Sequence, residues 1–230
     1  MTSLEDLYLF DNKLQGKIPA SLGNICVSIN RQLSVSTWIP PFQLFTLGIA
    51  SCKLGPSFPS WLQTQSCLSF LDISDAGIDD FVPDWLWNKS IGEMNMSFNS
   101  LKGRIPQFMG TLVNLEALVL RNNNLIGELP LTLKNCTRLV ILDVSENLLS
   151  GPITSWTGES LQQLEILSLR VNHFFGSVPV LLCNLRQIHL LELSRNHLSG
   201  EIRSCLRNFT AMMESGGEIA SERRMLRKRI

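Results

Sequence analysis

The sequence predicts an α/β solenoid, in which short parallel strands line a concave face and short helical or 3₁₀ segments cover the convex side. Three observations carry this prediction. A motif returns about every 24 residues, apolar residues occupy three fixed positions of each copy, and glycine and proline follow at fixed offsets. A fixed period of roughly 20 to 50 residues is typical of stacked repeats, in which each unit buries its apolar face against its neighbours.

Each copy is anchored on one position, which is asparagine in most of them. The anchors are Asn12, Cys52, Ala76, Asn99, Asn123, Asn147, Asn172 and Asn196. Apolar residues stand eight, five and three places before every anchor, as Leu115, Leu118 and Leu120 do before Asn123. The spacing predicts a short strand whose alternating side chains point inward, with strands stacked in parallel about 4.8 Å apart.

The asparagine is expected to satisfy buried backbone groups of neighbouring coils with its side-chain amide. Cys52 and Ala76 take its place in two copies, so we expect a weaker ladder there. Glycine then follows most anchors at the fourth position and proline at the seventh, as in Gly127 and Pro130. Glycine permits a tight bend, and proline ends strand pairing before the convex segment.

The repeat predicts one solenoid over residues 1–210, with about eight to nine copies. The interval from Asn12 to Cys52 is 40 residues, which is neither one period nor two, so residues 25–41 are expected to be irregular. A local deletion and a strained coil anchored on Asn30 are two interpretations of this stretch. Residues 211–230 form a basic tail that we expect to be solvated and disordered.

Composition excludes several classes of function. Twenty Lys plus Arg balance twenty Asp plus Glu, so no net charge attracts a nucleic acid. No apolar stretch reaches the roughly eighteen residues of a membrane helix, and the first residues do not form a signal peptide. This chain by itself is therefore expected to make no membrane contact.

No catalytic constellation is found, so we predict neither an enzyme nor a cofactor. Asp143 and Glu192 stand at equivalent positions two coils apart and are interpreted as surface charges. His173 and His197 each follow an anchor, which places one above the other in adjacent coils. Solvated turn residues are the simplest interpretation, and a pH-sensitive contact or a metal site are the alternatives. No metal ligand is assigned.

The exposed positions of the concave strands are where functional side chains of a solenoid stand. Arg121, Arg170 and Arg195 are our candidates for contacts with an anionic or carboxylate group. Tyr8 and Phe10 are candidates for an apolar contact with the same ligand.

Cysteines and glycosylation sequons add further candidates. Cys183 and Cys205 occupy similar places in successive coils, so a disulfide between them is a hypothesis, whereas Cys52 and Cys136 are expected to be packed thiols. Acceptor sequons begin at Asn88, Asn95, Asn135 and Asn208. Asn95 is expected in an exposed concave slot.

The repeat resembles the plant-specific class of extracellular leucine-rich repeats, whose signature L-x-G-x-I-P follows most anchors, with departures at Asp80, Thr154 and Arg203. Three stretches resemble plant receptor-like proteins of the ethylene-inducing-xylanase-receptor and Cf-type resistance group. They are WIPPFQLFTLGIASCKLGPSFPSWLQTQ (38–65), LDISDAGIDDFVPDWLWN (71–88) and GEIRSCLRNFTAM (200–212). The resemblance covers residues 1 to about 213.

The resemblance implies a partial ectodomain on the extracellular face of the plasma membrane. It implies recognition of a protein or peptide ligand in plant defence. Because the family lacks a kinase, it also implies an adaptor receptor kinase and a co-receptor kinase as signalling partners. A secreted inhibitor similar to polygalacturonase inhibitors, or a non-functional receptor fragment, are the alternatives.

Overall fold

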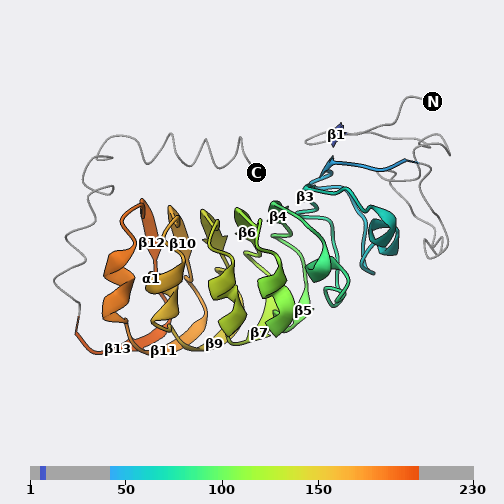
Figure 1. Cartoon of the computed structure of the whole chain (residues 1–230). Helices are drawn as coiled ribbons and strands as arrows, with labels where there is room; N and C mark the ends of the chain where they lie inside the picture. The colour runs from blue at the N-terminus through green and yellow to red at the C-terminus, as the bar shows by residue number, and fades with distance from the viewer. Residues whose placement is uncertain (1–5, 9–41, 202–230) are drawn as a thin grey trace, which may run out of the picture.

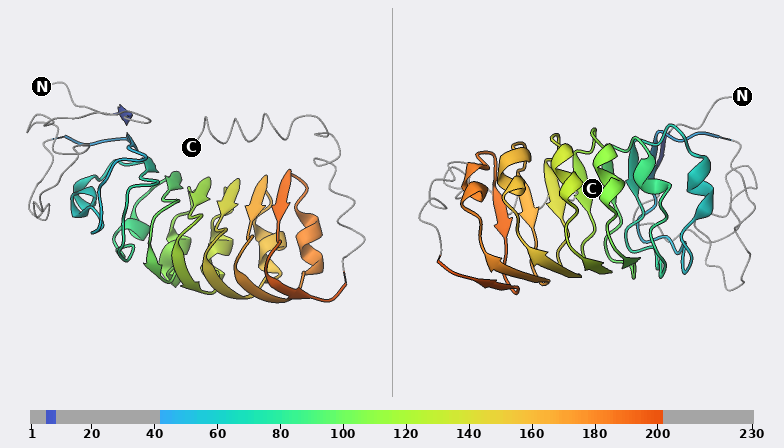
Figure 2. Two further views of the ribbon diagram at one scale, coloured as in Figure 1. Left: turned by 180° about the vertical axis from the view of Figure 1, so that it is seen from behind. Right: turned by 60° about the horizontal axis from the view of Figure 1, so that its bottom comes forward.

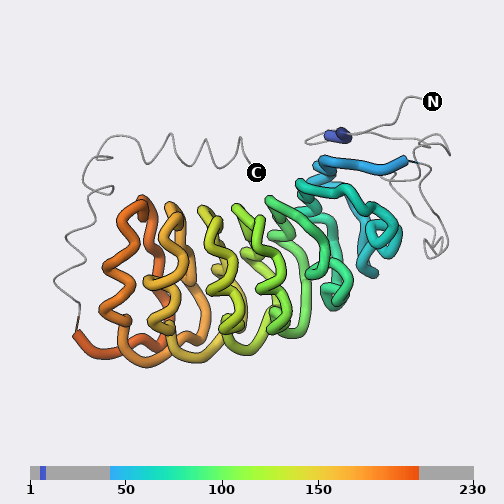
Figure 3. Tube along the Cα trace, in the orientation of Figure 1, coloured from blue at the N-terminus to red at the C-terminus, as the bar shows by residue number. Residues whose placement is uncertain are grey.

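The computed structural model describes residues 6–8 and 42–201, which form a solenoid of stacked coils (Figures 1 and 3). The predicted fold class is confirmed. The irregular stretch 25–41 and the basic tail 211–230 lie outside the described residues, so the proposed division of the chain stays a prediction. No helix within residues 6–8 and 42–201 has the length and apolar character needed to cross a membrane.

An eight-stranded parallel sheet lines the concave face, with one strand from each coil and the strands in sequence order. Its strands are β1 (Asp6–Tyr8), β2 (Thr46–Gly48), β3 (Phe70–Asp72), β4 (Glu93–Asn95), β6 (Ala117–Val119), β8 (Ile141–Asp143), β10 (Ile166–Ser168) and β12 (Leu190–Glu192). β1 pairs directly with β2, in a register that aligns Asp6 with Thr46. The 40-residue interval therefore separates neighbouring strands of this sheet.

A second parallel sheet runs along one edge of the stack, as the right-hand view of Figure 2 shows. It contains β5 (Lys102–Gly103), β7 (Asn124–Gly127), β9 (Leu148–Pro152), β11 (His173–Ser177) and β13 (His197–Ser199). These strands occupy the segment between anchor and proline, which the sequence analysis treated only as a bend. Gly127 adopts a φ of 87°, the left-handed region that favours glycine.

Each of the six coils between β2 and β12 carries one short helix on the convex side. They are the 3₁₀-helices η2 (Ser60–Thr64), η3 (Leu86–Asn88), η4 (Gln107–Thr111), η5 (Leu131–Asn135) and η6 (Val180–Asn184), and the α-helix α1 (Trp156–Ser160). Proline directly precedes four of the 3₁₀-helices, as Pro130 precedes η5. The coil with Thr154 in place of proline carries the α-helix instead.

The core is a stack of the inward-pointing apolar residues of the repeat. In the coils anchored from Cys52 to Asn172, all eighteen of these side chains are at most 2% exposed. In the last described coil Ile188 is buried, whereas Leu191 and Leu193 are partly exposed. Continuous apolar burial across neighbouring coils is the main stabilising contribution in this architecture.

The asparagine ladder forms as expected. Asn123 donates from Nδ2 to the carbonyls of Met96, Leu120 and Arg121 at 3.0, 3.0 and 3.3 Å, and its Oδ1 accepts the Leu101 N–H at 2.9 Å. Each such amide thus links its own turn to the preceding coil. Asn147, Asn172 and Asn196 repeat this arrangement.

The ladder is not left open at Ala76. The Leu54 N–H, which would otherwise meet an asparagine side chain, is accepted by the backbone carbonyl of Ala76 at 2.9 Å. The same carbonyl accepts the Gly55 N–H at 3.1 Å. A local change in backbone path therefore replaces the missing side chain at this position.

Candidate functional site

The most distinctive polar cluster of the concave face lies where β6, β8 and β10 end. Arg121 and Arg170 occupy the second place before their anchors, two coils apart, and Glu146 stands in the coil between them. Because successive concave strands lie about 4.8 Å apart, three consecutive coils bring these side chains within reach of one another.

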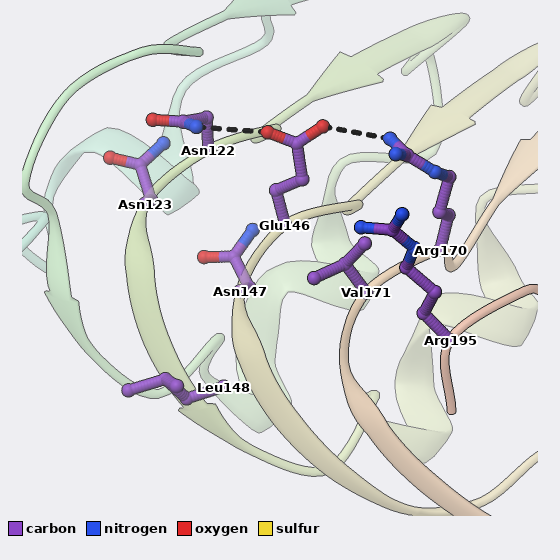
Figure 4. Close-up of a pocket in the computed structure, with 8 residues that line it drawn as sticks. All are labelled: Asn122, Asn123, Glu146, Asn147, Leu148, Arg170, Val171 and Arg195. Atoms are coloured by element: carbon purple, nitrogen blue, oxygen red, sulfur yellow. Dashed lines mark hydrogen bonds and ion pairs between the residues drawn. The ribbon is translucent and has the colours of Figure 1, made fainter. Parts of the chain in front are cut away.

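Glu146 is the centre of this cluster (Figure 4). Its Oε1 accepts hydrogen bonds from Arg121 Nη2 at 2.8 Å and from Arg170 Nη1 at 2.9 Å, and its Oε2 accepts one from Asn122 Nδ2 at 2.9 Å. The hydrogen bond from Asn122, together with the charges of Arg121 and Arg170, lowers the pKa of the Glu146 carboxyl. The carboxylate is therefore held by three donors from two different neighbouring coils.

Arg121 is further fixed by Phe98, whose ring lies 5.4 Å from the guanidinium carbon. Such a cation–π contact is worth about 0.5–1 kcal/mol at an exposed site. Arg121 Nε is buried and has no hydrogen-bond partner within the described part of the chain. The guanidinium is thus oriented by an aromatic face on one side and a carboxylate on another.

A shallow, open depression of about 480 Å³ lies beside this cluster. It is lined by Asn122, Asn123, Glu146, Asn147, Leu148, Arg170, Val171 and Arg195. Figure 4 shows the guanidinium groups of Arg170 and Arg195 on the same side of the depression. Arg121, Arg170 and Arg195 thus lie around Glu146, and Asp143 on β8 interacts electrostatically with Arg121 and with Glu192.

Several of these side chains project from strained turns. The residue before the anchor has a positive φ in seven coils, including Glu146 at 57°, Val171 at 54° and Arg195 at 57°. A positive φ in a β-branched residue such as Val171 is a genuine outlier, which costs about 1–3 kcal/mol. Glu146 occupies the same place before its anchor as Arg195, but the sequence analysis missed it because it took only arginine and aromatic side chains as candidates for ligand contacts.

The arginines named from sequence are thus brought together, but the aromatic candidates are not. Tyr8 is 54% exposed on β1, with its ring 6.3 Å from that of Phe70. β1 is four strands from β6, or about 19 Å at the usual strand spacing. Phe10 lies outside the described residues.

The acidic residues of the concave strands are more buried than expected. Asp143 was interpreted as a surface charge, but it is half-buried, and its Oδ1 accepts hydrogen bonds from the Ser145 N–H and hydroxyl at 2.9 and 2.6 Å. Asp72 is 1% exposed and makes the same two contacts with Ser74. Burial raises the pKa of both carboxyl groups.

Asn95 corrects another expectation. It is 8% exposed rather than projecting from the sheet, and its Oδ1 accepts hydrogen bonds from the Ser97 N–H and hydroxyl. A glycan on this amide would have to displace neighbouring side chains, since Asn95 lies between Asp72 and Val119 in the sheet. Asn88 and Asn135 are exposed at the ends of η3 and η5, where a glycan has room. Asn208 lies outside the described residues.

The cysteines divide into two groups. Cys183 is disulfide-bonded, and its expected partner Cys205 lies outside the described residues, so that pairing stays a prediction. Cys52 is also disulfide-bonded, so the expectation of a packed thiol there is wrong. Cys136 is a buried thiol, and burial raises its pKa to about 11. Cys67 is an exposed thiol.

Comparison with known proteins identifies the repeat. A family model described as Leucine Rich Repeat matches residues 3–25 and 114–136. Receptor-like protein EIX2 of Solanum lycopersicum is 39% identical over 141 residues, which cover 59% of this chain and 13% of that protein. Receptor-like protein EIX1 of the same species is 36% identical over 133 residues, covering 53% and 13%. The matches thus span about an eighth of these relatives.

Solved structures agree with this assignment. The ectodomain of the Arabidopsis receptor kinase HAESA, in complex with an IDA peptide hormone, matches with a TM-score of 0.69 and 31% identity. The match covers 85% of this chain and 30% of the HAESA chain. The repeat, the fold and the relatives agree: the chain contains leucine-rich repeats and is similar to plant receptor-like proteins.

Proposed function

We propose that this chain is part of the ligand-recognition ectodomain of a plant defence receptor, on the extracellular face of the plasma membrane. Its ligand is a protein or peptide that binds the concave surface. An adaptor receptor kinase and a co-receptor kinase transmit the signal. The similarity to EIX1 and EIX2 supports this proposal, as does the similarity to HAESA, which binds a peptide in its solved complex.

The observation that carries the proposal is the way Arg121, Arg170 and Asn122 hold the Glu146 carboxylate. These donors already have a geometry that accepts a carboxylate. Arg195 lines the same depression and adds a further cation. An acidic side chain or chain terminus of a ligand would bind Arg170 and Arg195 and compete with Glu146 for the shared donors.

Glu146 therefore acts as an internal competitor in this proposal. Its carboxylate lowers the net charge that a ligand meets, and an entering anion has to share or replace its hydrogen bonds. Replacing it with glutamine would keep the shape of the site while removing one negative charge. E146Q is expected to bind acidic peptides more tightly, by on the order of tenfold for about 1.4 kcal/mol.

The test is a peptide array probed with the purified chain, comparing acidic sequences with their amide counterparts. We expect the chain to retain acidic peptides, the R170A/R195A variant to lose them, and E146Q to retain them more strongly. R186A is the matched control, because Arg186 is an exposed cation outside the cluster. Equal binding of acidic and amidated peptides, or equal losses in R186A and R170A/R195A, would contradict the proposal.

A further inference from the structure

Two of the three histidines of the chain face each other on the second sheet, away from the concave strands. His173 begins β11 and His197 begins β13, and both side chains are exposed. Their ring centroids are 5.6 Å apart and the rings are tilted by 32°. We propose that this pair is a binding site for a divalent transition metal that favours tetrahedral coordination, with Zn²⁺ as the best fit.

The backbone holds the pair in place. Directly before His173, the Asn172 N–H donates to the Arg195 carbonyl at 3.2 Å. Directly after it, the Phe174 N–H donates to Asn196 Oδ1 at 3.0 Å, next to His197. Both histidines are therefore tied to the same two coils by the asparagine ladder. Preorganised ligands bind a metal more tightly because the second ligand is already at high effective concentration.

The ring separation fits one coordination geometry better than another. With Zn–N bonds of about 2.05 Å and a tetrahedral angle between them, two imidazole centroids lie about 5.2 Å apart. With a right angle between the bonds, as in square-planar or octahedral sites, the separation falls to about 4.5 Å. The observed 5.6 Å is closer to the tetrahedral separation than to the right-angled one.

The site supplies two protein ligands. Within residues 6–8 and 42–201, no three His, Cys, Asp or Glu side chains come together as metal ligands. Water then completes the coordination, so the site binds Zn²⁺ more weakly than a closed structural site does. The neighbours of the pair are also defined by the sheet, since Ser150 lies opposite His173 and Phe175 opposite His197. The apolar Phe175 ring, which is 52% exposed, gives the metal a less hydrated side.

The third histidine makes the experiment internally controlled. His189 precedes β12, outside the pair. NMR of the untagged full chain would follow the three imidazole Cε1–H resonances during a ZnCl₂ titration, with MgCl₂ as the hard-cation control. We expect two resonances to shift together with Zn²⁺, the third to stay, and none to respond to Mg²⁺.

Variants measured by calorimetry complete the test. H173A and H197A should each weaken Zn²⁺ binding by on the order of 100-fold, whereas H189A should leave it unchanged. All three residues are at least partly exposed, and an unchanged melting temperature without metal would show that each variant is folded. Two further results would overturn the proposal. One is a shift of all three resonances to the same extent, and the other is H173A binding Zn²⁺ as tightly as the parent chain.

Discussion

Replacement of Asn147 by alanine should destabilise the solenoid strongly, although the residue touches no candidate ligand. Asn147 is 6% exposed, and its Oδ1 accepts the Leu125 N–H at 3.1 Å. Its Nδ2 donates to the carbonyls of Leu120, Val144 and Ser145 at 3.0, 3.1 and 3.1 Å. Alanine leaves the Leu125 N–H and these carbonyls without their side-chain partner. A buried unsatisfied donor alone costs about 1–3 kcal/mol.

We therefore expect N147A to lower the free energy of unfolding by about 3 kcal/mol, counting the N–H and part of the carbonyl loss. For a domain of this size, that corresponds to a melting temperature about 6–12 °C lower. Urea denaturation and thermal scans of the full chain would measure both. Hydrogen exchange should place the loss of protection in the coils that contain Leu125 and Ser145, because repeats are coupled mainly to their neighbours.

N124A is the matched control for this prediction. Asn124 is also an asparagine of the same coil region, but it is exposed and begins β7, where its backbone N–H bonds the Leu101 carbonyl. Its replacement should change the free energy of unfolding by less than about 0.5 kcal/mol. If N147A and N124A unfold at the same urea concentration, the ladder does not stabilise this fold in the way argued.

Three further predictions concern the sheet, the convex packing and the sequons. Because burial raises the pKa of Asp72, its unfavourable contribution is absent below the unfolded pKa and develops as pH rises through the folded pKa. D72N, made in bacteria, should therefore raise the melting temperature at pH 7 but not at pH 3, and a thermal scan with equal gains at both pH values would contradict this. G158A should lower the free energy of unfolding by about 3 kcal/mol in urea titrations, since an added Cβ would lie 1.8 Å from the Leu181 carbonyl oxygen. G92A, where the nearest atoms lie at 3.7 Å, should be nearly neutral, and equal effects would refute the packing argument. In secreted protein, peptide mass spectrometry should find glycans at Asn88 and Asn135 and an unmodified Asn95, and a glycan at Asn95 would show that its strand is more accessible than its burial implies.

The sequence was most informative wherever one physical requirement recurs in every coil. The leucine positions were predictable because each must be buried, and Asn123 because each turn leaves backbone groups that an amide can satisfy from both sides. The second sheet was not predicted. Its strands are only two to five residues long. Their buried apolar residues, such as Leu125 and Leu149, are equally compatible with a bend that packs on the core.

The candidate site was only partly predictable, because its contacts join different coils through local geometry. Arg121 and Arg170 share a place in the repeat, so their proximity followed from the period. Glu146 does not share that place, and its contribution depends on a left-handed turn that lets its side chain reach both arginines. The burial of Asn95 was likewise not predicted, because its hydrogen bonds with Ser97 and its place between Asp72 and Val119 arise only in the folded sheet.

The residue directly before each anchor is a position where the recognition surface of such a fold can vary. Phe98, Asn122 and Glu146 all occupy it with a positive φ, and their side chains contact one another's coils rather than the leucine core. The backbone conformation at this place is the same whichever side chain occupies it, since Ser51 and Asp75 also have a positive φ although Cys52 and Ala76 follow them. Substitutions here therefore change charge and shape at the edge of the concave face at little cost to the core. Specificity can differ between relatives at these turns while the buried repeat stays the same.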